Sequence, residues 1–141
     1  MTEHPTHMDA FLAEPHMARV AVIRKSGQPH MKPIWYLYEG GKFILSTGRD
    51  SVTVRCLRRD PRITLCVDDP VAPYRAVVVE GTAEVVEGVG LDHELLGRLA
   101  RRYLGEEAAR GFLRGPLAQK QRVRLLVTPQ RWTTWDYRTG A

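Results

Sequence analysis

Cysteine is scarce in this chain, which has only Cys56 and Cys66 among its 141 residues. Two cysteines exclude the disulfide framework on which many small secreted domains depend. The N-terminus lacks the apolar segment of a signal peptide, and no apolar run approaches the roughly 20 residues of a membrane span. We therefore expect a cytoplasmic protein with no membrane segment, built as one domain over residues 1–141 with its ordered core at about 8–137.

Motifs of common catalytic and metal-binding sites are also missing. The five histidines show no spacing of zinc ligands, so no metal site is expected. Neither the G-x-G-x-x-G pattern nor the P-loop pattern occurs, and there is no G-x-S-x-G nucleophile elbow. Acidic residues are interleaved with basic ones and no recognition motif is visible, so nucleic acid is not expected as a partner.

What the composition does provide is positive charge and enough apolar residues for a core. Lysine and arginine number 21 against 16 acidic residues, a formal net charge of +5. Hydrophobic residues make up 43% of the chain, which is sufficient for a packed interior. The positive charge is mostly arginine, whose guanidinium suits bidentate contacts with phosphate, so anionic partners are favoured.

Alternating apolar residues and turn signals predict about seven short strands, flanked by a few helices. Gly81 interrupts the fifth strand and suggests a bulge, while Pro129-Gln130 suggests a turn before the last strand. Short antiparallel strands at this spacing predict a mainly β fold with flanking helices, shaped as a closed or nearly closed barrel. The predicted strands are 19–24, 29–38, 43–47, 63–67, 76–86, 121–128 and 132–137, and the predicted helices are 8–14, 51–59, 92–103 and 106–113.

The stretch from Phe43 to Ser51 joins an apolar strand to a small polar turn that opens a short cationic helix. Ser46, Thr47 and Ser51 offer hydroxyls there, and Arg49 offers a charge. Hydroxyls, backbone N–H groups and a helix N-terminus together suit a bound phosphate. The alternative is an ordinary strand-to-helix turn with a capping serine, and such turns are common.

The second predicted strand is another candidate site. Alternation places His30, Lys32 and Ile34 on one face of it, opposite Pro33 and Trp35. A proline inside a strand indicates an edge, where backbone groups are free to meet a ligand. A planar heterocycle could lie against Pro33, Ile34 and Trp35, with Lys32 near its polar edge. The alternative is an edge strand blunted by lysine and proline, with Trp35 in the core.

Two further candidates lie elsewhere in the chain. Arg55, Arg58 and Arg59 share the short cationic helix, where they could bind a polyanion or form a solvated helix face. Near the C-terminus, alternation places Trp132 and Trp135 on opposite faces of a strand. One tryptophan is then expected in the core, and the other in a ligand pocket or a subunit interface.

Eight short pieces carry a resemblance to a known family. Taken over about Phe11 to Tyr137, the sequence resembles the pyridoxamine 5'-phosphate oxidase-like split β-barrels, in particular their actinobacterial branch that uses the deazaflavin coenzyme F-420. The resemblance implies a Greek-key antiparallel barrel that forms a homodimer, with cofactor sites at the subunit interface. The matching pieces are residues 11–15, 27–30, 33–36, 46–51, 57–62, 79–83, 127–129 and 135–137.

The same resemblance implies an oxidoreductase in which F-420 passes a hydride to a small unsaturated or electron-poor molecule. It names no catalytic residue. The segment from His30 to Trp35 would run along the deazaflavin ring, and Ser46 and Thr47 would meet the phosphate-bearing tail. The phosphate-binding stretch would contain Arg49, Ser51 and Thr53, and the partner subunit would contribute Arg75, Arg131 or Trp135.

Thr53 departs from the family pattern, which usually has a phosphate-pairing lysine there. A charge-assisted hydrogen bond is roughly twice as strong as a neutral one, so Arg49 or Arg55 is the expected substitute. Two alternatives stay open because of this departure. One is an FMN-dependent oxidase or reductase of the same fold. The other is a non-catalytic protein that binds a cofactor, haem or tetrapyrrole, with His30 as the axial ligand.

Overall fold

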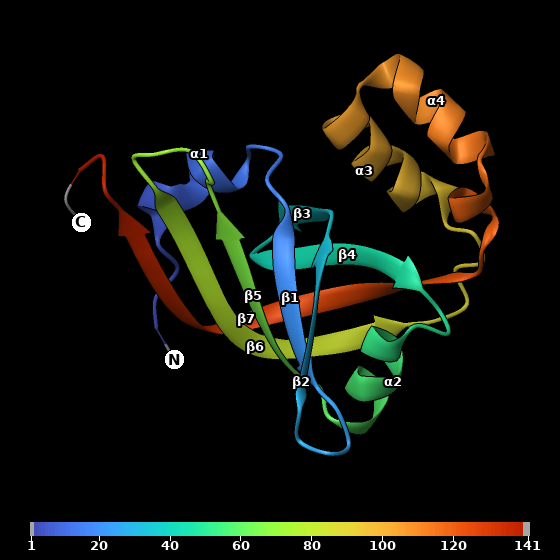
Figure 1. Ribbon diagram of the computed structural model, residues 1–141, viewed down its shortest axis with the longest axis horizontal. Helices are drawn as coiled ribbons and strands as arrows, with labels where there is room; N and C mark the ends of the chain where they lie inside the picture. Colours follow the sequence, from blue (N-terminus) through green and yellow to red (C-terminus); the bar gives the residue numbers. More distant parts are fainter. Residues whose placement is uncertain (1, 140–141) are drawn as a thin grey trace.

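Seven strands form one antiparallel sheet in the computed structural model, which describes residues 2–139 (Figure 1). Their order across the sheet is β2-β1-β5-β6-β7-β4-β3. The strands are β1 (Ala18–Ile23), β2 (Pro29–Ile34), β3 (Tyr36–Glu39), β4 (Lys42–Gly48), β5 (Arg62–Asp68), β6 (Arg75–Val86) and β7 (Arg122–Asp136). The helices are α1 (Asp9–Leu12), α2 (Val52–Arg59), α3 (His93–Leu104) and α4 (Glu106–Arg114), with short 3-10 helices at Thr6–Met8 and Pro116–Gln119.

The sheet curls because its two edge strands are joined by a single residue. β2 and β3 lie at opposite ends of the strand order, yet only Trp35 separates them in the sequence. Lys32 on β2 donates a hydrogen bond to the Thr47 hydroxyl on β4 at 3.0 Å, which brings one edge against the strand beside the other. The predicted mainly β fold with flanking helices is therefore confirmed, and the sheet has the half-barrel form of a split β-barrel.

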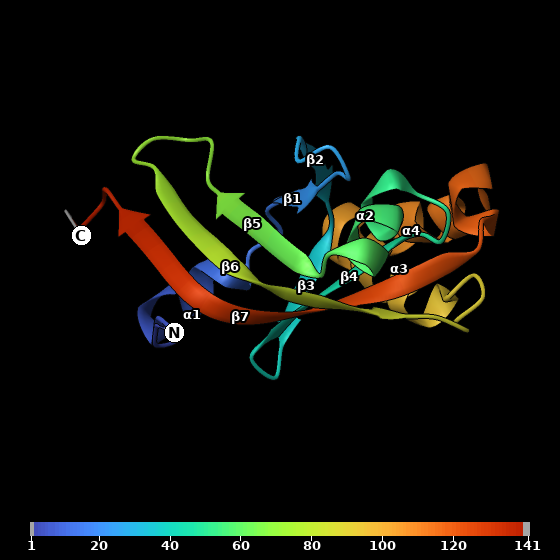
Figure 2. The same cartoon turned by 90° about the horizontal axis from the view of Figure 1, so that it is seen from below.

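Two apolar clusters hold this arrangement together. Ile34 and Tyr36 belong to the main core inside the curl, whereas Trp35 and Leu37 pack in a smaller cluster under α3. The alternation predicted for this segment is therefore confirmed, since even and odd positions go to different clusters. Figure 2 shows α1 near one end of the long strands β6 and β7, and α3 and α4 near the other. The main core also contains Met8, Phe11, Leu12, Phe43, Leu45, Leu65, Val123 and Leu125, all buried.

Two predicted strand boundaries are wrong. The strand predicted at 29–38 stops at Ile34 and resumes at Tyr36, because the chain changes sheet edges at Trp35. The turn predicted at Pro129-Gln130 does not exist, since β7 runs on through it. The predicted bulge explains why: the β6–β7 register shifts between Glu80 and Gly81, where Gly81 pairs with Pro129 and Glu80 with Arg131. A bulge tolerates a proline that cannot donate to the ladder.

α2 begins and ends at residues that the sequence indicates. The Ser51 hydroxyl accepts a hydrogen bond from the Val54 backbone N–H at 3.3 Å, so Ser51 is the N-cap. Asp60 and Pro61 follow the last turn. Within residues 2–139, no helix is both long and apolar enough to cross a membrane.

Asp60 provides a pH test of the local structure after α2. Its carboxylate accepts hydrogen bonds from the side chain and the backbone N–H of Arg62, which lower its pKa to about 2. Because the folded pKa lies below the model-peptide value of about 3.9, this interaction stabilises the fold above that value. Its contribution is lost as the pH falls toward 2. NMR titration of the Asp60 carboxyl should give this low midpoint, and Arg62→Gln should raise it; an unchanged midpoint in the variant would contradict the pairing.

Candidate cofactor pocket

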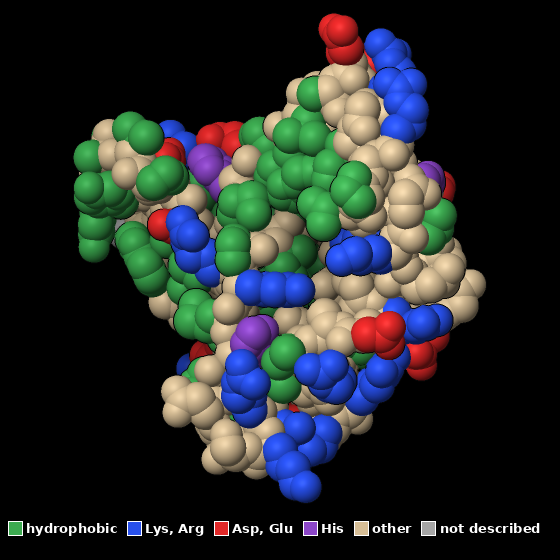
Figure 3. All heavy atoms as spheres, turned by 45° about the vertical axis from the view of Figure 1, so that its right-hand side comes forward, with side chains coloured by type: hydrophobic (Ala, Val, Ile, Leu, Met, Phe, Trp, Pro, Cys, Tyr) green, Lys and Arg blue, Asp and Glu red, His purple; other side chains and the backbone are tan. Residues whose placement is uncertain are grey.

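A cavity of about 280 Å³ lies between the edge strands and the segment of residues 93–119, which we call the α3–α4 hairpin. Figure 3 shows this face, with hydrophobic side chains gathered above a hollow and basic side chains below it. Of the predicted site residues, Lys32, Pro33, Ile34, Trp35, Ser46 and Thr47 all line the cavity. Met17, Leu96, Leu99, Phe112, Leu117 and Arg122 complete the lining.

Two cations form the polar end of the pocket. Lys32 donates to the Thr47 hydroxyl, and the Arg122 Nε donates to the Ser46 hydroxyl at 2.7 Å. Among residues 2–139 neither cation forms an ion pair. Burial, and then the charge of Arg122, lower the pKa of the Lys32 ammonium; burial likewise lowers the pKa of the Arg122 guanidinium. Two half-buried cations without an ion pair make this end of the pocket a favourable place for an anion, although the Asp92 carboxylate partly offsets the charge of Arg122.

Trp35 forms part of the apolar end but is itself covered by the hairpin. Its indole stacks on the Tyr103 ring with centroids 5.2 Å apart and planes at 6°, and Phe112 packs against it at 5.2 Å and 54°. One indole face is therefore unavailable to a ligand. Pro33 and Ile34 supply the remaining apolar floor on the sheet side.

Tyr103 fixes the break between β2 and β3. Its hydroxyl donates to the His16 carbonyl at 2.6 Å and accepts from the Tyr36 backbone N–H at 3.1 Å. The neighbouring Arg102 donates to the carbonyls of residues 12–14, which lie at the end of α1. These contacts join the hairpin to the sheet at the point where the chain changes edges.

Tyr103→Phe should lower the free energy of unfolding by roughly 1–2 kcal/mol, because it leaves the Tyr36 N–H and the His16 carbonyl without this partner while keeping the ring stack. Urea denaturation followed by tryptophan fluorescence measures the change. Tyr137→Phe removes a hydroxyl from a side chain that is 63% exposed and should have little effect. Equal stability of the two variants would show that the Tyr103 hydroxyl does not anchor the hairpin.

The predicted phosphate corner forms a second, separate pocket. Gly48, Arg49, Asp50 and Ser51 line it on one side, with Lys120 and Gln121 on the other. The Arg49 backbone N–H donates to the Gln121 carbonyl at 2.9 Å, which holds the turn against the start of β7. Arg55 lies one turn along α2 and donates to the Asp50 carbonyl at 2.8 Å. This turn pocket thus combines two basic side chains with the N-terminus of α2, and it also contains the Asp50 carboxylate, 3.5 Å from the Arg49 Nε.

Thr53 and His30 lie apart from both pockets. Thr53 is only 1% exposed on the inner face of α2, and its hydroxyl has no partner among the described residues. The His30 ring shares a hydrogen bond with Arg24 at 3.1 Å. Burial, and then the charges of Arg24 and Lys32, lower the pKa of His30.

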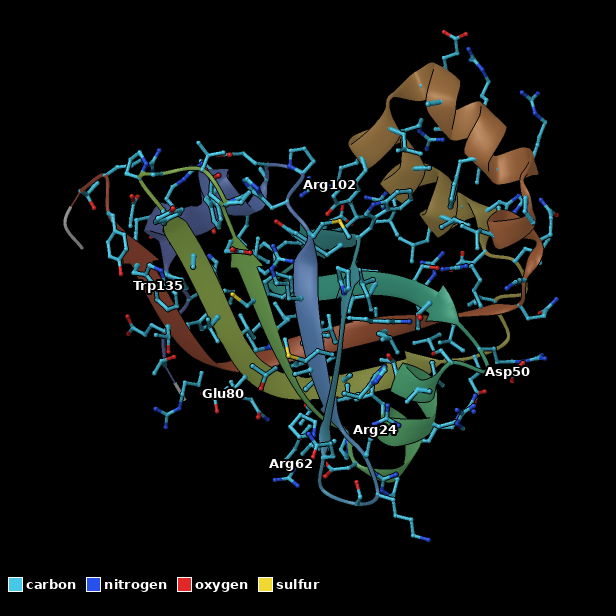
Figure 4. All side chains as sticks on the ribbon, in the orientation of Figure 1. Arg24, Asp50, Arg62, Glu80, Arg102 and Trp135 are labelled. Atoms are coloured by element: carbon cyan, nitrogen blue, oxygen red, sulfur yellow. The ribbon has the colours of Figure 1, made fainter. Side chains whose placement is uncertain are left out.

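The residues suggested for the partner's share of the site lie at the other end of the sheet. Trp135 and Arg131 lie on the far part of β7, and Figure 4 shows Trp135 at the opposite side of the molecule from Asp50. Arg75 is mostly buried between Glu14 and Asp69, with N–O distances of 3.0 and 2.6 Å. None of these three lines the cavity of its own chain.

Sequence reasoning missed Arg122 and the whole hairpin side of the pocket. Arg122 alternates with Val123 at the start of a predicted strand, and this pattern indicates only that it points away from the core. The apolar stripe of the helix at 92–103 was visible, but it is equally typical of a helix that merely covers the sheet. The sequence does not indicate which edge of the sheet the hairpin covers, because this is a property of the tertiary structure.

A curled antiparallel sheet with a basic pocket between its edges defines a split-barrel protein. The chain belongs to the pyridoxamine 5'-phosphate oxidase family, whose sequence profile matches residues 5–136. A comparison with curated proteins gives no match.

Solved structures share the fold over almost the whole chain. The conserved hypothetical protein Rv2991 from Mycobacterium tuberculosis is similar with a TM-score of 0.74 and 27% identity, covering 98% of this chain and 88% of that one. An F420 reductase is similar with a TM-score of 0.73 and 22% identity, covering 89% of this chain and 94% of that one. An FAD-binding protein from Mesorhizobium loti is similar with a TM-score of 0.67 and 20% identity, covering 95% of each chain. The fold is therefore compatible with more than one flavin-type cofactor, and the site must decide between them.

Proposed function

We propose that this protein is an oxidoreductase that uses coenzyme F-420 to transfer a hydride to a small unsaturated or electron-poor molecule. The observation that carries the proposal is the pair of half-buried cations without an ion pair, Lys32 and Arg122, beside an apolar wall. A deazaflavin cofactor combines a flat ring with an anionic tail, and the pocket offers a counterpart to each. The similarity to an F420 reductase supports this choice of cofactor.

The size of the pocket and the position of the second one favour F-420 over FMN. Ligand pockets usually enclose roughly 300–1,000 Å³, so a cavity of about 280 Å³ holds only part of a cofactor. The turn pocket beside Arg49 and Lys120 provides a second, separate place for anionic groups. A cofactor with a phosphodiester and a polyglutamate tail can use both, whereas FMN has a single terminal phosphate.

Thr53 does not weaken this assignment. Its hydroxyl is buried inside α2 and lines neither pocket. We propose that Lys32, Arg122 and Arg49 bind the anionic groups, with Ser51 and Arg55 shaping the turn. The Ser46 and Thr47 hydroxyls hold the two cations in place. The cofactor would supply the hydride, while the chain binds, orients and excludes water.

We do not expect the Tyr36 hydroxyl or the His30 ring to supply the proton for the reaction. The Tyr36 hydroxyl is buried and donates to the Leu12 carbonyl at 2.8 Å, and burial raises its pKa further above its ordinary value. The His30 ring shares a hydrogen bond with Arg24, and burial lowers its pKa. Solvent is therefore the proposed proton source.

The haem alternative finds little support in the pocket. An axial ligand must face the haem iron, and no histidine lines the cavity. His30 is directed to Arg24 instead. FMN stays the main alternative cofactor, because the fold also occurs in a protein that binds another flavin, FAD.

We further propose that the protein is a homodimer. Tyr74 and Tyr137 are 49% and 63% exposed, and the Tyr137 N–H donates to the Tyr74 carbonyl, so the two tyrosines form one exposed apolar patch; Val71, in the same loop as Tyr74, is 69% exposed. This patch and Trp135 lie far from the pocket of their own chain, so Trp135 can contact a cofactor only in a partner. Light scattering should give the mass of two chains at micromolar concentration, and the mass of one chain would contradict the dimer.

Reduced F-420 mixed with a quinone, an enone and a nitroaromatic tests the activity itself. The expected result is protein-dependent oxidation of F-420, followed by its absorbance, with at least one acceptor. The protein as isolated should carry no flavin absorbance. Tight F-420 binding without turnover of any acceptor would contradict the reductase activity and indicate a protein that only binds F-420.

A further inference from the structure

A third cavity lies between the N-terminal segment, the turn that joins β3 to β4, and the middle of β7. Its volume is about 630 Å³, within the roughly 300–1,000 Å³ that ligand pockets usually enclose. It shares no lining residue with the cofactor pocket or the turn pocket. We call it the N-terminal pocket, and its lining includes His4, Asp9, Tyr38, Gly41, Lys42 and Trp132.

The N-terminal segment forms a fixed wall of this pocket. It lies beside β7 (Figure 2), where the Thr2 backbone N–H donates to the Gln130 carbonyl at 3.0 Å. The Thr2 hydroxyl also accepts a hydrogen bond from the Trp132 backbone N–H. Further along the segment, Met8 is buried in the main core. Residues 2–8 are therefore held at both ends, and the cavity that they cover is a built feature of the fold.

Aromatic rings and one carboxylate form part of the lining. The His4 ring stacks on Tyr38 with centroids 5.7 Å apart and planes at 17°, and it meets Trp132 edge-on at 5.2 Å and 74°. The His4 Nδ1 shares a hydrogen bond of 3.0 Å with the Tyr38 hydroxyl, and its Nε2 lies 2.7 Å from the Asp9 carboxylate. Both ring nitrogens are therefore engaged, and the Asp9 carboxylate already has a partner.

The turn between β3 and β4 brings hydrogen-bond donors and a positive charge to the same cavity. Gly40 and Gly41 have φ angles of +59° and +77°, a conformation that favours glycine. Their backbone N–H groups donate to no other residue within 2–139. Lys42 is exposed and forms no ion pair in that part of the chain. A carboxylate placed here would gain charge-assisted hydrogen bonds.

We propose that the N-terminal pocket is a second ligand site, which binds a small aromatic carboxylate. Lys42 and the N–H groups of the Gly40-Gly41 turn bind the carboxylate, and the ring of the ligand lies against Trp132 and Tyr38. The site goes beyond the proposed hydride transfer and does not depend on it, since no residue of the cofactor pocket takes part.

The charges in the pocket favour an anion over a cation. His4 engages the Asp9 carboxylate, whereas the Lys42 ammonium has no acidic partner among the described residues, so a bound amine would compete with His4 and a bound carboxylate would not. The rings favour an aromatic body over an aliphatic one, because stacked and edge-on contacts between aromatic rings add to the free energy of burial.

2-Naphthoate and its uncharged analogue 2-naphthamide are suitable probes, because they have nearly the same shape and differ in charge. Isothermal titration calorimetry measures both affinities. Lys42→Met should weaken 2-naphthoate binding roughly two- to fivefold, the effect of an exposed ion pair, and should leave 2-naphthamide binding unchanged. Lys25→Met is the matched control, since Lys25 is exposed in the β1–β2 turn and lines none of the three pockets. No binding of 2-naphthoate at millimolar concentration, or equal weakening in both variants, would overturn the proposal.

Competition with F-420 separates the N-terminal pocket from the cofactor pocket. Protein saturated with F-420 should bind 2-naphthoate as tightly as the free protein does, and the amide NMR signals of Gly40 and Gly41 should shift on binding. Displacement of 2-naphthoate by F-420, without shifts at these two glycines, would place the probe in the cofactor pocket and overturn the second site. If F-420 does not bind at all, the cofactor assignment fails, and the comparison of Lys42→Met with Lys25→Met still decides the second site.

Discussion

Arg122→Met should weaken F-420 binding by roughly ten- to a hundredfold. Hydrogen bonds to charged groups contribute about 1.5–3 kcal/mol, and each 1.4 kcal/mol corresponds to about a tenfold change in affinity. Methionine keeps most of the side-chain length and apolar stem, so the pocket wall is preserved while the charge is lost. Fluorescence titration with F-420 measures the affinity.

Arg110→Met is the matched control for this experiment. Arg110 is exposed on α4 and lines neither pocket, so the variant has the same change in net charge without touching the site. Its affinity for F-420 should stay within about twofold of wild type, because exposed charges at a distance are largely screened by salt. Equal weakening in both variants would mean that F-420 responds to overall charge and not to the pocket.

Gly81→Ala should lower the free energy of unfolding by on the order of 3 kcal/mol, the upper end of the usual cost of overpacking. A Cβ atom at Gly81 would overlap the Thr128 carbonyl oxygen on β7, a backbone atom that cannot move without shifting the strand. Gly81 pairs with Pro129 at the bulge where β6 and β7 change register. The methyl group would therefore disturb the curl that brings the two edges of the sheet together.

Gly111→Ala should instead raise the free energy of unfolding of the same protein. Gly111 lies in α4, and a Cβ atom there would meet nothing within 4 Å. Alanine should stabilise this helix by about 0.5–1 kcal/mol, because it loses less backbone entropy on folding. Thermal or urea unfolding measures the free energy of unfolding of both variants. Similar stability of Gly81→Ala and Gly111→Ala would contradict the role given to Gly81.

Local patterns in the sequence predict most of the fold because each follows from backbone geometry. The alternation through Ile34, Trp35 and Tyr36 assigns these residues to the correct clusters, and Ser51 caps the helix as its hydroxyl suggests. The turn prediction at Pro129 fails for a physical reason. A proline usually ends a strand, but here a bulge opposite Gly81 accommodates it, and the sequence of β7 alone carries no sign of its partner.

The candidate site shows the same division between local and tertiary information. Lys32, Ser46 and Thr47 could be proposed because they stand on strands with recognisable patterns. Arg122 could not be proposed, because it enters the pocket only through its hydrogen bond to Ser46 across the β4–β7 pair. Resemblance to the family directed attention to Thr53, whereas burial in the structure places its side chain away from both pockets.

Titration of the wild-type protein with F-420 and, separately, with FMN tests the central claim most directly. The account predicts F-420 binding at micromolar or lower concentration, with clearly weaker binding of FMN, because two separate basic pockets suit a cofactor with more than one anionic group. Binding of FMN in preference to F-420, or of neither, would contradict it.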